Sequence, residues 1–175
     1  MDQNVGLLKK LSSFYVARKL IENGRVSVEK GNIMVDLSKK LEMVNDLAGY
    51  LAQEIEPANF WRAVVGLNFN ENYFCQEFSR KANADRYFFV PEGNELTSIA
   101  QEFIGVVRAE VVIVTGIIND SLLDRLSEQA KELVKNRGII KSIKIFTVVD
   151  HSSPKERDRL EVISLTRPED FLLPA

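Results

Sequence analysis

Residues 111–121 carry the side chains that are best placed to do chemistry. An apolar β-branched run is followed by short polar positions and then by an amphipathic helical pattern. In such a strand–loop–helix layout, the free backbone amides at the start of the helix bind phosphate groups. The layout therefore predicts a phosphate-binding site. Its candidate ligand-binding residues are Thr115, Gly116, Asn119, Asp120 and Ser121.

The start of that helix also carries features that oppose phosphate binding. Asp120 places a negative charge where a phosphate would lie, which disfavours binding electrostatically. Ser121 and Asp124 fit a capping box, in which the serine accepts a hydrogen bond from a free amide and the acid reaches back. We therefore favour a structural cap at Ser121 over a ligand role, while both interpretations stay open.

The composition is that of a single soluble domain. The chain has 175 residues, of which 45% are hydrophobic and 27% charged, and its net charge is −2. This balance argues against a broad basic surface for nucleic acid. No apolar run is long enough to span a membrane, and the N-terminus lacks the pattern of a signal peptide. We therefore predict a cytoplasmic protein with neither nucleic-acid nor membrane partners.

Metal and thiol chemistry have little support in the sequence. The single cysteine, Cys75, excludes an internal disulfide, and the single histidine, His151, argues against a zinc site. We expect Cys75 to be a small core residue. His151 follows a predicted strand in a Ser/Pro loop, so a solvated side chain is favoured and a ligand role is the alternative. No cofactor is predicted, except magnesium brought by a phosphorylated ligand.

Hydrophobic periodicity predicts an α/β fold. Helical patterns cover residues 4–23, 38–55, 70–83, 94–104 and 121–136, with Asn94 as the expected cap of the fourth. Strand patterns cover residues 25–28, 32–36, 61–67, 86–90, 110–115, 139–149 and 160–165. From residue 61 onward the strands and helices alternate, which predicts a mainly parallel sheet flanked by helices on both faces. Tyr73, Phe74 and Phe78 are expected to be buried.

In this order the elements resemble the orotate phosphoribosyltransferases, which belong to the type I phosphoribosyltransferase family. Residues 34–41 resemble that family's junction between a β-hairpin hood and the next helix. Val64-Val65-Gly66 resembles its strand that ends in glycine, residues 110–115 its phosphoribosyl pyrophosphate strand, and Val148-Val149-Asp150 its late strand. The resemblance implies one domain over 1–175, with an N-terminal helix and hood hairpin in 1–37 and the core in 38–175.

The motifs that the resemblance would require are altered. Thr115 and Gly116 stand where the family has two acids that contact the ribose hydroxyls. Residues 67–71, Leu-Asn-Phe-Asn-Glu, replace the small residues that let backbone amides approach pyrophosphate. We expect Phe69 in this stretch to pack in the core or in an interface. His151 stands where the family has an arginine that contacts the orotate base, and it cannot reproduce a bidentate fork.

The catalytic loop is the third departure. Residues 91–102 contain no Lys, Arg or His, whereas the family uses basic residues there to neutralise the leaving pyrophosphate. Each such clamp is commonly worth about a hundredfold or more in rate. We therefore expect this segment to form a regular helix that fills a vacated site.

Two functions remain after these comparisons with the family. The favoured one is a non-catalytic orotate phosphoribosyltransferase-like protein that senses a nucleotide or serves as a structural partner in pyrimidine metabolism. The resemblance implies a homodimer, and an active transferase is a conceivable partner. The alternative is an active enzyme that makes orotidine 5′-monophosphate with magnesium, using Gly116, Asn119 and Ser121 for phosphate and Arg25 or Arg108 for charge. Regulation linked to nucleic acid would rest on fold analogy alone.

Overall fold

The computed structural model describes residues 2–29, 32–38, 41–57, 60–91, 94–136, 138–153 and 160–171. The helices are α1 (Asp2–Glu22), α2 (Leu41–Ala52), α3 (Asn72–Lys81) and α4 (Asp120–Asn136), with 3₁₀ turns η1 (Phe69–Glu71), η2 (Leu96–Phe103) and η3 (Pro168–Phe171). The strands are β1 (Val26–Glu29), β2 (Asn32–Val35), β3 (Trp61–Gly66), β4 (Arg86–Phe89), β5 (Ala109–Asn119), β6 (Ile140–His151) and β7 (Glu161–Thr166).

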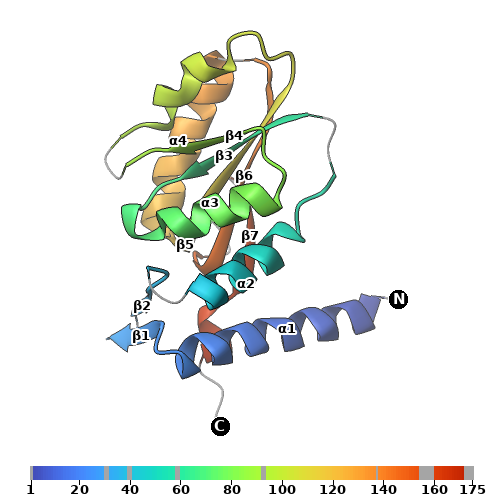
Figure 1. The fold of residues 1–175 in the computed structure, drawn as a ribbon, viewed down its shortest axis with the longest axis vertical. Helices are drawn as coiled ribbons and strands as arrows, with labels where there is room; N and C mark the ends of the chain where they lie inside the picture. Colours follow the sequence, from blue (N-terminus) through green and yellow to red (C-terminus); the bar gives the residue numbers. More distant parts are fainter. Residues whose placement is uncertain are drawn as a thin grey trace.

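A five-stranded sheet forms the centre of the molecule, in the order β4-β3-β5-β6-β7 (Figure 1). Every neighbouring pair in this sheet is parallel, so all its strands end at one edge. The predicted mainly parallel sheet is therefore confirmed. Ligands bind outside the carboxyl ends of the strands in open parallel sheets, so this edge is where a site is expected.

Helices cover both faces of the sheet because its central strands are apolar on both sides. Val112 and Val114 of β5 belong to a core shared with α1, α2 and α3. Val111 and Ile113, which alternate with them, belong to a second core shared with α4 and η2. Figure 1 shows α2 and α3 on one side of the sheet and α4 on the other. Within the described ranges, no helix combines the length and apolarity needed to cross a bilayer.

The central strand is longer than its sequence pattern predicts. β5 runs without a break from Ala109 to Asn119, and α4 begins at Asp120. The predicted strand over 110–115 is therefore confirmed as part of β5, whereas the loop predicted after it is wrong. The ladder with β6 continues through Thr115↔Thr147 and Ile117↔Val149, so pairing with a long neighbouring strand holds this stretch extended.

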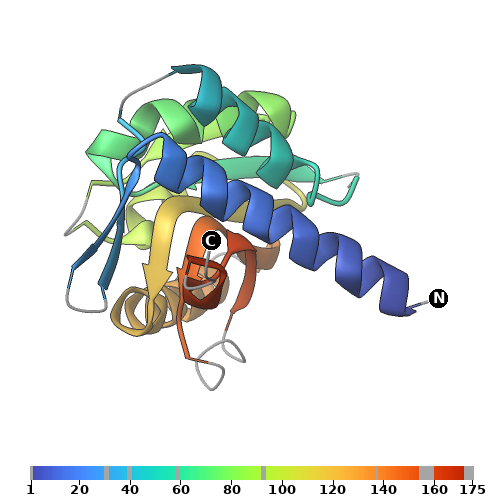
Figure 2. The same ribbon diagram turned by 90° about the horizontal axis from the view of Figure 1, so that it is seen from below.

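The N-terminal elements form a separate layer. β1 and β2 pair as an antiparallel hairpin, as predicted, although residues 30–31 of its turn lie outside the described residues. Arg25 and Asp36 join the base of this hairpin by an ion pair of 3.2 Å. α1 crosses beneath the sheet, and its N-terminal end extends beyond the rest of the molecule (Figure 2). The predicted second helix is observed from Leu41, and residues 39–40 are not described.

Two predictions about local packing are wrong and one is confirmed. The α-helix predicted over 94–104 is instead the 3₁₀ turn η2 (Leu96–Phe103), and its cap position is Glu95 rather than Asn94. Tyr73 is 37% exposed, whereas Phe74 and Phe78 are fully buried as predicted. Helical periodicity does not separate Tyr73 from these neighbours, because its ring lies at the border of the buried face of α3.

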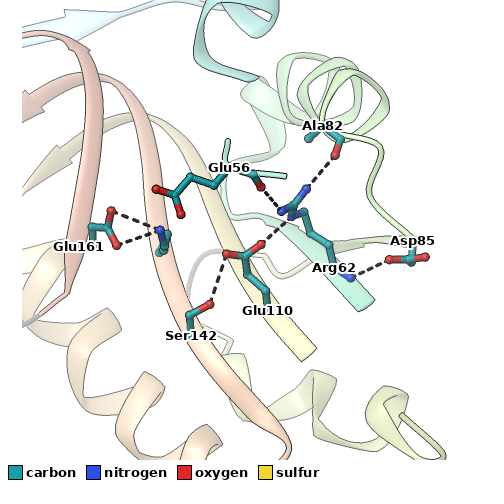
Figure 3. Close-up of polar contacts among 8 residues, drawn as sticks. Glu56, Arg62, Ala82, Asp85, Glu110, Ser142 and Glu161 are labelled. Atoms are coloured by element: carbon teal, nitrogen blue, oxygen red, sulfur yellow. Dashed lines mark hydrogen bonds and ion pairs between the residues drawn. The ribbon is translucent and has the colours of Figure 1, made fainter. Parts of the chain in front are cut away.

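A buried polar cluster lies at the amino ends of the strands (Figure 3). The guanidinium of Arg62 forms an ion pair of 2.7 Å with Glu110 and donates to the carbonyls of Glu56 and Ala82. The Arg62 backbone amide donates to Asp85 at 2.7 Å. Every partner is a structural group of the protein itself, so this cluster fastens the end of the sheet that lies opposite the ligand-binding edge.

Candidate functional site

A cleft of about 360 Å³ opens at the carboxyl edge of the sheet. Its walls come from the segments after β3 and β4, from the end of β5 and from the first turns of α4. The lining residues are Leu67, Asn68, Glu71, Val90, Pro91, Asn94, Thr115, Ile117, Asn119, Ser121, Leu122, Arg125, Leu126 and Gln129. The cleft therefore lies where parallel sheets place their ligands.

The carboxylate of Glu71 forms part of the cleft lining. The residue is only 4% exposed. Its Oε2 accepts hydrogen bonds from the Gly116 amide at 2.7 Å and from the Thr115 hydroxyl at 3.1 Å. Burial raises the pKa of Glu71, while these two donors act in the opposite direction. A Cβ at Gly116 would lie 2.6 Å from Oε1, so the absence of a side chain at Gly116 lets the carboxylate approach.

The end of β3 is packed in a similar way. A Cβ at Gly66 would lie 2.5 Å from the Tyr87 hydroxyl and 2.9 Å from the Cβ of Cys75. The Tyr87 hydroxyl donates to Asn72 at 2.6 Å. Cys75 is buried, as predicted. Burial raises the pKa of its thiol, and the nearby charge of Glu71 raises it further. Side chains of the protein therefore occupy the space beside the glycine that ends this strand.

Asn119 and Asp120, at the start of α4, each accept a hydrogen bond from a backbone amide, one within the helix and one outside it. Asn119 Oδ1 accepts from the Leu122 amide at 2.9 Å, so Asn119 caps the helix and the predicted cap at Ser121 is wrong. Ser121 lies inside the first turn because α4 begins one residue before it. Asp120 Oδ1 accepts from the Ser153 amide at 2.6 Å and joins α4 to the segment after β6.

The structure brings together three of the predicted site residues. Thr115, Asn119 and Ser121 line the cleft. Gly116 lies beside it and donates its amide to Glu71. The two other candidates, Asp120 and His151, are not among the lining residues, and His151 is half-buried opposite Asn119 in the β5–β6 ladder.

The cations proposed for an active enzyme lie elsewhere. Arg108 precedes the amino end of β5, and its guanidinium stacks 3.8 Å from the centre of the Phe60 ring. Arg25 is paired with Asp36 at the base of the hairpin. Among the described lining residues, Arg125 is the only basic side chain.

Sequence reasoning missed Arg125 and Gln129. Arg125 lies three residues after Leu122, and Gln129 lies four residues after Arg125, so they share the face of α4 that lines the cleft. Projecting the helix from Ser121 onward would have found them. Gln129 Oε1 also accepts from the Leu96 amide at 3.0 Å, which holds η2 against α4.

The described residues of the segment after β4 border the cleft and do not fill it. Leu96, Ile99 and Phe103 of η2 are buried in the core beside α4. Of this segment, Pro91 and Asn94 line the cleft. The expected helix that fills the site is therefore wrong. Phe69 does not pack in the core, since it is 78% exposed, with an edge-on contact to Phe89; its predicted place in an interface stays a prediction.

The architecture matches solved phosphoribosyltransferases. Orotate phosphoribosyltransferase from Mycobacterium tuberculosis H37Rv, solved with Fe(III) dicitrate, aligns at a TM-score of 0.61 and 14% identity over 93% of this chain and 99% of that one. A phosphoribosyltransferase from Corynebacterium diphtheriae aligns at 0.60 and 16% over 93% and 99%. Orotate phosphoribosyltransferase from Aeropyrum pernix aligns at 0.56 and 14% over 90% and 96%.

The chain has the type I phosphoribosyltransferase fold. No protein-family model and no curated protein sequence matches it. At these identities the likeness to type I phosphoribosyltransferases concerns the fold alone. Among the described residues, no three His, Cys, Asp or Glu side chains gather in a way that could hold a metal ion. Any function must therefore be argued from the cleft itself.

Proposed function

We propose that this chain is a non-catalytic relative of the orotate phosphoribosyltransferases that binds a nucleotide in the cleft. Its role would be to sense that nucleotide, or to act as a structural partner, in pyrimidine metabolism. The observation that carries the proposal is the contact of the Glu71 carboxylate with Gly116 and Thr115. These positions would bear the two ribose-binding acids in an active relative, and here their polar groups are bound to the protein itself.

The supply of positive charge supports the same proposal. An enzyme that releases pyrophosphate must stabilise several developing negative charges, and each lost clamp reduces the rate by about a hundredfold or more. Arg125 is the only basic side chain among the described residues that line the cleft. Asn119 caps α4 and Asp120 adds a carboxylate at its start, so the helix offers little to a second phosphate.

Binding a nucleotide without catalysis requires fewer positive charges in the cleft than the release of pyrophosphate does. Its volume of about 360 Å³ lies within the range of small-molecule pockets, and its lining combines apolar walls with a few polar groups. Magnesium would enter only with a phosphorylated ligand. We further propose that the protein acts as a homodimer, by analogy with the orotate phosphoribosyltransferases, and that an active transferase is a candidate partner.

A second candidate function is a divergent active transferase. Glu71 favours it, because this residue returns one carboxylate to the cleft beside Thr115. It would require basic groups other than Arg25 and Arg108, which are engaged elsewhere.

Calorimetry and a turnover assay separate the two functions. The protein is titrated with phosphoribosyl pyrophosphate, orotate and uridine monophosphate in the presence of magnesium, and orotidine 5′-monophosphate formation is then measured. The proposal predicts binding of uridine monophosphate without turnover. Turnover that is lost in Glu71→Gln would establish the second candidate, and no heat from any ligand would leave only a structural role.

A further inference from the structure

We propose that Arg125, together with amide side chains that line the same cleft, holds a single oxyanionic group of a ligand whose ring lies on the apolar walls of the cleft. The group is a carboxylate or a phosphate monoester. This inference rests on the proposed function and deepens it, because it names the chemical class that the cleft accepts and the residue that selects it.

The charged side chains of the cleft are few. Arg125 and Glu71 are the only charged side chains among the described lining residues. Arg125 is exposed to solvent, whereas Glu71 is buried and already accepts two hydrogen bonds from β5. Among the described lining residues, the accessible charge is therefore one guanidinium, which suits one oxyanion and leaves the several charges of a pyrophosphate without partners.

Three amide side chains that line the cleft share one orientation. Asn68, Asn119 and Gln129 each use the side-chain oxygen to accept from a backbone amide, at 3.0, 2.9 and 3.0 Å respectively. Their amino groups are the parts left for a ligand, and these can only donate. Together with the Arg125 guanidinium, they make the polar part of the cleft rich in donors. A ligand rich in acceptor oxygens is complementary to it.

The cleft also has apolar walls. Leucine, isoleucine, valine and proline side chains supply it, and they come from the segments after β3 and β4, from β5 and from α4. These residues are Leu67, Val90, Pro91, Ile117, Leu122 and Leu126. Such walls suit a planar ring, so the ligand class is an oxyanion carried by a small aromatic or heteroaromatic group.

The position of Arg125 separates this site from an ordinary helix N-terminus. Asn119 and Asp120 occupy the helix start, whereas Arg125 lies more than one turn further along α4. The side chain of a helical residue, rather than the free backbone amides, would therefore supply the binding group. Guanidinium binds carboxylate and phosphate in a bidentate manner, which fixes the orientation of the bound group.

The test compares matched variants in calorimetric titrations with uridine monophosphate, orotate and uridine. Arg125→Gln removes the guanidinium, and Lys131→Gln is the control because it removes one positive charge from an exposed site on the same helix. Gln129→Glu retains an acceptor for the Leu96 amide but replaces the free amino group with an oxygen. Thermal unfolding of each variant checks that it is folded.

We expect uridine monophosphate or orotate to bind to the unaltered protein and uridine to bind at least about tenfold more weakly. Arg125→Gln and Gln129→Glu should each lower the oxyanion affinity about tenfold or more, with Lys131→Gln unchanged. Preference between the two oxyanions identifies phosphate or carboxylate as the recognised group. Equal binding of uridine, or unchanged affinity in Arg125→Gln, would overturn the inference while the proposed nucleotide binding stands. Absence of binding by all three ligands would refute both.

Discussion

The carboxylate of Glu71 accepts a 2.7 Å hydrogen bond from the backbone amide of Gly116, and the two residues belong to different segments at the carboxyl edge of the sheet. Gly116 belongs to the central strand, whereas Glu71 ends the short turn after β3. The contact places an acid beside Thr115 and Gly116, the two positions where the resemblance to the orotate phosphoribosyltransferases would require acids. It also makes the lining of the cleft dependent on the protonation state of a buried group.

Glu71→Gln should change how stability depends on pH. Burial raises the folded-state pKa above the ordinary value of 4.5, so between these two values the folded protein holds a proton that the unfolded chain has released. The contribution of Glu71 to the free energy of unfolding is therefore fully present below pH 4.5 and is lost as the pH rises through the folded-state pKa. Glutamine removes this ionisation and retains an acceptor for Gly116. Thermal unfolding is measured from pH 4 to 8. The stability of Glu71→Gln relative to the unaltered protein should increase as the pH rises. Parallel curves of stability against pH would contradict the raised pKa of Glu71.

Gly116→Ala should destabilise the fold. Its Cβ would lie 2.6 Å from Glu71 Oε1 and 3.0 Å from Leu37 Cδ1, so the carboxylate must move, at a cost of about 1–3 kcal/mol. Gly49→Ala is the control, because its Cβ would meet Lys81 only at 3.6 Å and alanine favours a helix by about 0.5–1 kcal/mol. Urea denaturation should therefore shift in opposite directions for the two variants. An unchanged free energy of unfolding in Gly116→Ala would mean that the Glu71 side chain can move away at no cost in stability.

Asn119→Ala should lower the free energy of unfolding by about 1 kcal/mol, because it removes the acceptor for the Leu122 amide. Ser121→Ala should change it by no more than about 0.5 kcal/mol, since this residue lies within the first turn. Chemical denaturation of the two variants measures both values. The reverse order would place the cap at Ser121, as the spacing of Ser121 and Asp124 alone predicts.

Glu110→Ala should be the most damaging of these changes. It leaves the buried guanidinium of Arg62 without its carboxylate, which typically costs about 3–5 kcal/mol. Removing both charges, in Arg62→Met with Glu110→Leu, should recover part of the loss. Glu128→Ala breaks an exposed pair on α4 and should cost no more than about 0.5 kcal/mol. Similar losses for Glu110→Ala and Glu128→Ala would show that the buried pair is not needed for stability.

The arrangement of the sheet could be predicted because its strands and helices differ in hydrophobic period. β3 and β5 are apolar on both faces, and α4 is apolar on one, so the order of layers followed from the pattern. The end of β5 could not be predicted in this way. Thr115 and Gly116 have the composition of a turn, and they stay extended because β6 pairs with Thr115 and with Ile117 to Asn119 on the other side of Gly116.

The site was harder to predict because its decisive contacts join distant segments. Glu71 and Gly116 are separated by 45 residues, and nothing local at either position indicates their hydrogen bond. Asn119 rather than Ser121 became the cap because the tertiary pairing of β5 decides where α4 can begin. Arg125 is the exception: the sequence analysis missed it, although helical periodicity from Ser121 would have been sufficient to place it in the cleft.

The two ends of the sheet differ in how freely they can open. Arg62 joins the segment before β3, the end of α3, the turn before β4 and strand β5 through one guanidinium and one amide. Opening any one of these segments would expose a charged group that the others keep buried, so they should unfold and exchange their amide hydrogens as a single cooperative unit. Motions that admit a ligand are therefore confined to the carboxyl edge, and the amino edge acts as the fixed base about which the cleft can adjust.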